Sequence, residues 1–261
     1  MKVAILITGQ LRDYRINCLN HIKHIIEPNN ADVFIYACNK NTMHTTGPNI
    51  TQNYKITTAY AKEQIEEEVK IIYGDHLKGV AINENEELDD SNFGTLGYFK
   101  KRMNNQMTNI RKGFLMSQEY ATQNNFKYDV IVRCRPDNSM FPFESDLSKI
   151  QIKQNHVYTT IYPSGHKDPW FFSFSEPETF NKYCSFIYLP DADENRTDNN
   201  FLHPEASLEK YLFDSGMNTI YFPSICLPYY QYDKTQPVTD FPYRQKHENL
   251  IDADGNLVEQ Q

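Results

Sequence analysis

The stretch Tyr128–Phe141, YDVIVRCRPDNSMF, indicates the class of the fold. Its contiguous β-branched run, VIV, is typical of a strand that is covered on both faces in a parallel sheet. Side chains alternate across a strand, so Arg133 and Arg135 are expected on the same face. Asp137 lies on that face too if the chain stays extended past Pro136. Because an unpaired buried charge is costly, these arginines must meet carboxylates or a bound anion.

The chain upstream of this strand alternates between short apolar runs and amphipathic segments. The apolar runs predict buried strands at residues 2–8, 31–37 and 69–74. The amphipathic segments predict a helix after Gly9 that stops at Pro28, a charged helix near residues 59–68, and a helix with Met107, Ile110, Phe114 and Ala121 on one face. Polar segments at residues 39–55 and 83–92 are expected to be loops. This alternation predicts an α/β fold with a mostly parallel central sheet and helices on both faces.

The chain downstream predicts further strands and helices. Residues 156–175 indicate two strands separated by a loop, and residues 176–187 indicate a helix. A second helix is expected in residues 203–216, with proline at its first position, Leu208, Tyr211 and Leu212 facing inward, and Gly216 ending it. The segment DADGN at residues 252–256 is typical of a hairpin turn.

Composition excludes several classes of protein. The 261 residues carry a net charge of −8, which argues against sequence-independent binding to nucleic acid. Five scattered cysteines without a CxxC spacing indicate reduced thiols rather than a disulfide framework or a zinc site. No stretch approaches the roughly 20 apolar residues of a transmembrane helix, and the N-terminus lacks the features of a signal peptide. We therefore expect a cytoplasmic protein; its oligomeric state is left open.

Polar clusters follow three of the predicted strands. They read TGQLRD at residues 8–13, CNKN at residues 38–41 and RCRPDN at residues 133–138. Ligands of parallel α/β sheets bind beyond the carboxyl ends of the strands. The three clusters therefore predict a binding site at that edge.

Four segments carry a resemblance to a known family: ITGQLRDY at residue 7, YDVIVRCRPD at residue 128, DPWFFSFSEPETF at residue 168 and HPEASLEKYL at residue 203. The chain resembles, over roughly residues 2–214, small GT-A-type glycosyltransferases of capsule, lipopolysaccharide or surface-glycan synthesis in bacteria and large DNA viruses. The resemblance implies a GT-A-like, Rossmann-related sheet and transfer of a sugar from a nucleotide-sugar to a hydroxyl. It also implies one glycosyltransferase domain, residues 1–261, with a nucleotide-sugar-binding half (about 1–140) and an acceptor-binding half (about 141–261).

The first predicted loop is expected to contact the nucleotide. The resemblance implies that Gln10 reaches the base or ribose and Arg12 a phosphate, after the turn at Gly9. A loop that opens a helix also presents free backbone N–H groups to anions. The alternative is a capped turn with Arg12 at the surface.

Charge on the departing diphosphate needs a partner. GT-A enzymes usually hold Mn²⁺ or Mg²⁺ with Asp-x-Asp at the end of a central strand, whereas this chain has one acid there, Asp137. Asp137 is the predicted metal ligand, with diphosphate oxygens and waters completing the shell. Two alternatives stay open: Arg133 or Arg135 neutralises the diphosphate directly, or the arginines form internal salt bridges, for example with Asp129 or Asp32. The literal Asp-x-Asp triplets at residues 191–193 and 252–254 end no buried strand and are weaker candidates.

The acceptor side is predicted from the resemblance. His166, Asp168 and Trp170 precede a strand in a region that shapes the acceptor pocket, where Trp170 stacks on a sugar ring unless it packs in the core. Glu205 is the first candidate for the catalytic base and Asp168 the second. An acid in the first helical turn is also favoured by the helix dipole alone, which is the alternative for Glu205.

Two other functions stay open as alternatives. A sugar nucleotidyltransferase shares the α/β architecture, but the first loop lacks the glycine-rich run that cradles a triphosphate. A non-catalytic module that binds nucleotide or glycan is consistent with a single acid at Asp137. A lipid-linked acceptor would bring the protein to a membrane surface by peripheral association.

Overall fold

The computed structural model describes residues 1–11, 14–39, 41–44, 54–57, 61–83, 95–140, 146–161, 172–187, 204–223 and 226–228. The strands are β1 (Val3–Gln10), β2 (Asp32–Cys38), β3 (Asn41–His44), β4 (Tyr54–Thr57), β5 (Leu77–Asn83), β6 (Val130–Cys134), β7 (Asn138–Met140), β8 (His156–Ile161), β9 (Phe172–Ser175), β10 (Asn218–Pro223) and β11 (Cys226–Pro228). The α-helices are α1 (Tyr14–His21), α2 (Lys62–Tyr73), α3 (Thr95–Gln123), α4 (Pro177–Tyr183) and α5 (Pro204–Asp214).

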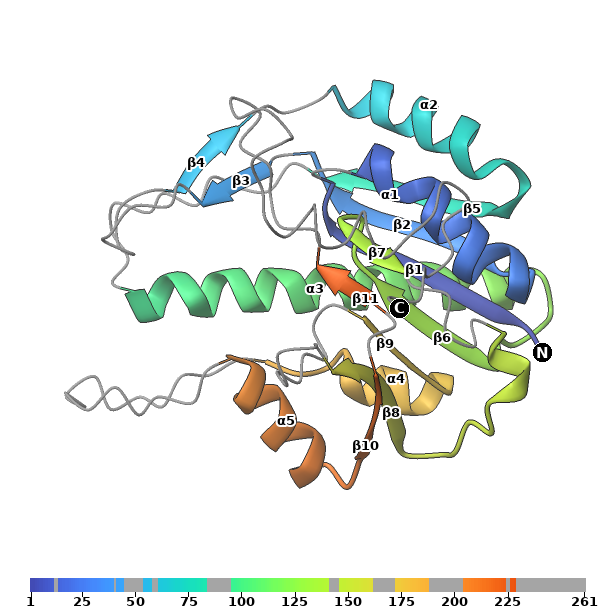
Figure 1. The fold of residues 1–261 in the computed structure, drawn as a ribbon, viewed down its shortest axis with the longest axis vertical. Helices are drawn as coiled ribbons and strands as arrows, with labels where there is room; N and C mark the ends of the chain where they lie inside the picture. Colours follow the sequence, from blue (N-terminus) through green and yellow to red (C-terminus); the bar gives the residue numbers. More distant parts are fainter. Residues whose placement is uncertain are drawn as a thin grey trace, which may run out of the picture.

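A seven-stranded sheet organises these elements (Figure 1). Its order is β10-β8-β9-β6-β1-β2-β5, with strands from both halves of the chain. All neighbouring pairs are parallel except those of β9, which runs antiparallel to both β6 and β8. The predicted α/β class and mostly parallel sheet are confirmed.

Helices cover both faces of the sheet, as predicted. Along β1, Val3, Ile5 and Ile7 belong to a core that includes residues of α1 and α2. Ala4 and Leu6 belong to a second core with residues of α3, α4 and α5. Figure 1 shows α1 and α2 on one side of the sheet. Because both faces are buried, β1 needs apolar residues at consecutive positions, which explains its unbroken apolar run.

Helix α3 lies unusually close to the carboxyl half of β1. A Cβ atom added at Gly113 would lie 3.0 Å from Cγ2 of Thr8 and 3.6 Å from Cβ of Tyr36. Glycine therefore permits this close approach. In Figure 1 the N-terminal end of α3 extends past the sheet on the side where β3 and β4 lie.

The predicted strand at residues 69–74 is wrong. Residues Val69 to Tyr73 form the last turns of α2, and the strand is β5, which begins at Leu77, after the predicted strand has ended. Ile65, Val69 and Tyr73 recur every four residues and are buried, so helical periodicity continues through the apolar run. The sequence of β5, LKGVAIN, is only partly buried and so lacks a strong strand signal.

The remaining predicted strands and helices are confirmed in the second half of the chain, whereas two predictions in the first half need correction. The predicted loop at residues 39–55 contains the start of a two-stranded antiparallel ribbon, β3 with β4. Pro28 lies inside a 3₁₀ turn, Glu27–Asn29, that follows a π-helical turn, Ile22–Ile26, so the helical run ends after it rather than at it. The strands and helices predicted from residue 156 to residue 216 are confirmed as β8, β9, α4 and α5, with Leu208 and Leu212 buried and Gly216 at φ +70°. The turn predicted at residues 252–256 lies outside the described residues.

Four cysteines of the described part, Cys18, Cys38, Cys134 and Cys184, are buried, and no disulfide joins them. Within the described ranges, no helix combines the length and the apolar character that crossing a membrane requires.

An ion pair joins α1 to α2. Arg15 Nε donates to both Glu68 oxygens at 3.1 and 3.0 Å, and the Tyr14 hydroxyl donates to the same carboxylate. Partial burial raises the pKa of Glu68, but the hydrogen bonds from Tyr14 and Arg15 outweigh it and hold the pKa below its ordinary value. A carboxyl group with a lowered folded-state pKa stabilises the fold above its unfolded pKa, and this contribution is lost as pH falls through the folded value.

Glu68→Gln is therefore expected to lower the free energy of unfolding by about 0.5–1 kcal/mol at pH 7, a modest value because the pair is partly solvent-screened. The difference from the wild type should shrink as the pH falls below about 4. Urea denaturation at pH 7, 5 and 3 measures it. A difference that is equal at all three pH values would show that the charge of Glu68 contributes nothing.

Candidate functional site

The parallel strands end at one edge of the sheet, where the predicted site residues of the described chain gather. Gly9 and Gln10 end β1, and Arg135 follows β6 directly. Asn39 follows β2, and Asn83 ends β5. The parallel registers of β1 with β2 and β6, and of β2 with β5, bring these ends together.

The loops after β1 and β6 contact each other. Gly9 has φ +129°, a conformation that L side chains rarely adopt, and a Cβ atom there would lie 3.7 Å from Cδ of Pro136. Leu11 N–H donates to the Cys38 carbonyl at 3.3 Å and links the first loop to β2. Glycine is required here by the backbone conformation.

The side chain of Asp137 lies beside that of Arg135, but the backbone conformation between the two residues differs from the expected one. The chain turns at Pro136 and Asp137 instead of staying extended, which corrects the sequence-based expectation. Proline restricts the backbone at that turn. Arg135 Nε donates to Asp137 Oδ1 at 2.7 Å and Nη2 donates to Oδ2 at 2.5 Å. The result is a bidentate ion pair in which Asp137 is 2% exposed and Arg135 15% exposed.

The internal partners suggested for the arginines have other contacts. Asp129 Oδ2 accepts from the backbone N–H of Lys2 at 2.6 Å. Asp32 accepts from the Tyr128 hydroxyl at 2.7 Å and lies 3.8 Å from Nζ of Lys78. Arg135 therefore forms an internal salt bridge, which was one of the two alternatives. Its partner is Asp137 rather than Asp129 or Asp32.

Arg133 is fully buried, with 0% of its side chain exposed. It pairs in register with Leu6 on β1 and Ser173 on β9, so it lies on the face that α3 covers. The hydroxyl oxygens of Thr8 and Ser173 on this face are buried without a hydrogen-bond partner among the described residues. The buried guanidinium therefore lies beside the Ser173 hydroxyl in the register of the sheet, on the face that also carries Thr8. Cys134 points to the opposite face, where burial raises the pKa of its thiol to about 12.

Three asparagines form a group that the sequence motifs did not identify as a unit. Asn39 N–H donates to the Asn83 carbonyl at 3.2 Å, and Asn83 Nδ2 donates to Asn109 Oδ1 of α3 at 3.2 Å. Asn39 and Asn109 are buried. Asn39 belongs to the CNKN cluster. No sequence motif links Asn83 with Asn109, because their contact depends on how α3 packs on the sheet.

The acceptor-side predictions lie outside the described residues or depend on side chains that are not described. His166, Asp168 and Trp170 are outside, as is Arg12 of the nucleotide side, and Glu205 is described only as part of α5. The segment that contains residues 162–171 connects Ile161 of β8 with Phe172 of β9. Phe172 pairs with Cys134, one residue before Arg135. Helix α5 leads into β10, which is parallel to β8.

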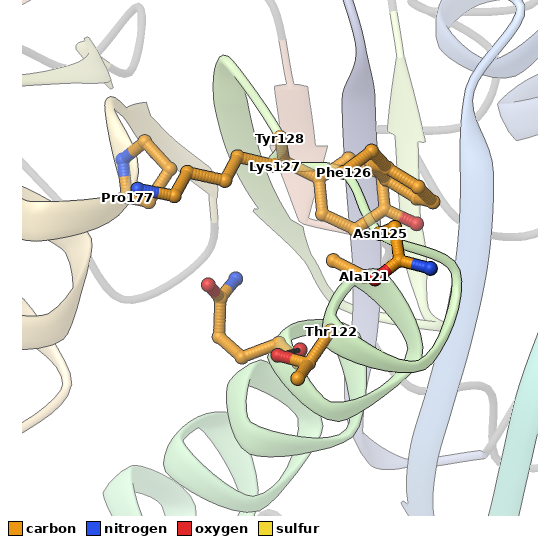
Figure 2. A pocket seen from close by; sticks show the side chains of 8 residues that line it. Ala121, Thr122, Asn125, Phe126, Lys127, Tyr128 and Pro177 are labelled. Atoms are coloured by element: carbon orange, nitrogen blue, oxygen red, sulfur yellow. Dashed lines mark hydrogen bonds between the residues drawn. The ribbon is translucent and has the colours of Figure 1, made fainter.

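A surface hollow of about 550 Å³ lies at the opposite edge, where β6 begins. It is lined by the end of α3, the residues that precede β6, and Pro177 of α4. Figure 2 shows these side chains, with Lys127 extended toward Pro177. Lys127 is the single charged residue among the lining residues that the structure describes, and the Tyr128 hydroxyl is bonded to Asp32. The hollow therefore lacks the paired charges of the carboxyl edge.

Comparison with known proteins gives structural neighbours and no sequence relatives. No family model and no curated protein matches the chain. The apo-form glycosyltransferase GlyE of Streptococcus pneumoniae TIGR4 is similar at a TM-score of 0.41 and 10% identity, over 84% of this chain and 45% of that one. A glycosyltransferase involved in glycosylation of the major capsid of PBCV-1 is similar at a TM-score of 0.35 and 12% identity, over 85% and 83%. This chain thus spans less than half of the first neighbour. Both neighbours are glycosyltransferases.

Proposed function

We propose that the chain is a GT-A-type glycosyltransferase that moves a sugar from a nucleotide-sugar donor to a hydroxyl of a surface glycan or a lipid-linked acceptor. The observation that carries the proposal is the carboxyl edge of the sheet. There, Gly9 lies near Pro136, Arg135 forms a bidentate pair with Asp137, and the buried Arg133 lies two residues before Arg135. The loop after β1 precedes the N-terminus of helix α1. Guanidinium groups near such a loop suit the binding of a nucleoside diphosphate.

The residues divide into two sets in this proposal. Gln10 and Arg12 contact the nucleotide, while Arg133 and Arg135 stabilise the negative charge that develops on the departing diphosphate. An acceptor hydroxyl oxygen bonds to the anomeric carbon as the bond from that carbon to the diphosphate oxygen breaks. The diphosphate takes the electron pair, and a carboxylate takes the hydroxyl proton.

Glu205 is the first candidate for that carboxylate and Asp168 the second. His166 and Trp170 join Asp168 at the acceptor. The register of β9 with β6 supports an acceptor side near the diphosphate, because residues 162–171 lead from β8 to Phe172 of β9, which pairs with Cys134, the residue before Arg135. Helix α5 is followed by β10, which runs parallel to β8. This order supports a position of the first turn of α5 near the carboxyl edge of the sheet.

Calorimetric titration with UDP, GDP, CDP and CMP tests the proposal, followed by sugar release from the matching nucleotide-sugars with an acceptor panel. Binding of one nucleotide together with turnover supports it. Binding of a nucleotide without turnover of any donor would replace it with a non-catalytic binding module. If none of the four nucleotides binds, the glycosyltransferase function is wrong.

A further inference from the structure

The surface hollow lies where β6 begins, and the proposed function gives it no role. Its volume is about 550 Å³, and small-molecule sites of proteins have volumes of roughly 300–1,000 Å³. The chain from Tyr128, which lines the hollow, to Arg135 of the candidate site runs along β6 for roughly 20 Å. We infer that the hollow is a second binding site, specific for a hexose unit that carries a carboxylate group. The choice of a sugar rests on the proposed function, in which the acceptor is a glycan.

Half of the lining of the hollow is apolar. Ala121 and Tyr128 are buried, and Phe126 and Pro177 are partly exposed. The rings of Phe126 and Tyr128 meet edge to face, with centroids 5.0 Å apart. A hexose ring carries C–H groups on its faces and hydroxyl groups around its edge. The apolar side chains therefore provide a surface for the C–H groups.

The polar half of the lining is nearer the solvent. Thr122, Asn125 and Lys127 are exposed, and Gln118 is partly exposed. The Thr122 hydroxyl donates to the Gln118 carbonyl at 2.8 Å, so its oxygen is presented as an acceptor. The side-chain amides of Gln118 and Asn125 can both donate and accept. Because sugar hydroxyls also donate and accept, a polyhydroxyl ligand matches these groups.

The charge of the lining favours an acidic sugar over a neutral one. Lys127 is the single charged residue among the described residues that line the hollow, and Figure 2 shows it extended toward Pro177. The carboxylate of Glu176 is engaged at the start of α4, where it accepts from the backbone N–H groups of Glu178 and Thr179 at 2.9 Å each. The described lining thus offers Lys127 no acid, and a carboxylate on the ligand supplies one.

The turn that carries Asn125 and Lys127 is fixed by the end of α3. Phe126 N–H donates to the Ala121 carbonyl at 3.0 Å. Asn125 N–H donates to the Thr122 carbonyl at 3.2 Å. Asn125 has φ +58°, the left-handed conformation that commonly ends a helix and that asparagine tolerates. The hollow is therefore formed before a ligand binds, which lowers the ordering cost of binding.

NMR titration of the isotope-labelled protein tests the inference, with the methyl glycosides of glucose and galactose and of their two uronic acids. Both uronides should shift the backbone amide signals of residues 118–128, and each should bind about threefold more tightly than its neutral counterpart. Lys127→Gln should abolish this preference, because it removes the positive charge and keeps a polar side chain of similar length.

Two further variants complete the design. Asn125→Gly should weaken binding of uronides and neutral sugars alike, by about threefold, through the loss of one hydrogen-bonding side chain. Glycine suits the positive φ at this position, so the turn is retained. Lys153→Gln is the matched control, because Lys153 is exposed before β8 and does not line the hollow. It should change neither the affinity nor the preference for uronides.

Three outcomes overturn the inference. The uronides shift no signal of residues 118–128 in the wild type, or the preference for uronides survives Lys127→Gln, or a nucleoside diphosphate binds these residues in place of the sugars. The proposed function is judged separately, from nucleotide binding and turnover. Turnover of a nucleotide-sugar without a response of residues 118–128 to the uronides removes this inference alone. Uronide binding there by a protein that binds no nucleotide removes the proposed function and leaves the hollow as a sugar-binding site.

Discussion

Replacing Arg133 with methionine is expected to weaken binding of the donor nucleotide about 100-fold while the protein remains folded. Arg133 is fully buried and pairs in register with Ser173, near the end of the strand that leads to Arg135. A hydrogen bond to a charged group contributes about 1.5–3 kcal/mol, and about 2.7 kcal/mol corresponds to 100-fold in affinity. Methionine retains much of the buried volume, so the loss of charge is separated from the opening of a cavity.

Titration of the nucleotide into Arg133→Met and Arg133→Lys measures this effect, with urea denaturation as the check on stability. Lysine keeps the charge but not the planar fork, so its affinity should fall between those of the wild type and the methionine variant. If Arg133→Met changes the free energy of unfolding and leaves nucleotide affinity unchanged, Arg133 is part of an internal network and does not meet phosphate.

Phe174→Ala is expected to lower the free energy of unfolding by about 3–5 kcal/mol. Phe174 is 0% exposed in β9 and stacks on Tyr158 of β8, with ring centroids 4.9 Å apart and an interplanar angle of 10°. It also meets Phe172 edge to face at 5.9 Å. Alanine would remove both ring contacts and leave a cavity between β6 and β8, the strands that β9 joins.

Urea denaturation measures this loss, and Phe213→Ala is the matched control. Phe213 is 80% exposed on α5, so its removal should change the free energy of unfolding by no more than about 0.5 kcal/mol. If the Phe174→Ala and Phe213→Ala variants lose equal stability, the aromatic contacts across β9 do not hold the two parts of the sheet together.

Strands with residues buried on both faces were the most predictable part of this protein. Consecutive apolar residues in β1, β2 and β6 mark such strands directly, because most positions along β1 and β2 and all positions of β6 are buried. The inward face of α5 was predictable for the same reason, since Leu208 and Leu212 recur at helical spacing. Strand β5 is only partly buried, so it lacks the run of consecutive apolar residues that predicts a strand.

The candidate site was predictable in location but not in contacts. Carboxyl ends of parallel strands share one edge, so Gly9, Gln10, Arg133, Arg135 and Asp137 were placed near one another from their positions after or within strands. The roles assigned to these residues stay predictions. The bond between Arg135 and Asp137 could not be derived, because it depends on a turn at Pro136 where an extended chain was expected.

The sequence by itself determined the α/β class, the buried strands and the edge of the sheet at which polar residues follow those strands. Hydrophobic periodicity and the burial that it predicts depend on residues that are close together in the sequence. Short stretches of chain are therefore sufficient to predict them. Only the tertiary structure decided that β9 runs antiparallel between β6 and β8, that Asn109 of α3 bonds Asn83 of β5, and that Asp137 turns back onto Arg135. Each of these contacts depends on how elements or turns are oriented in space, which local patterns of polarity do not specify.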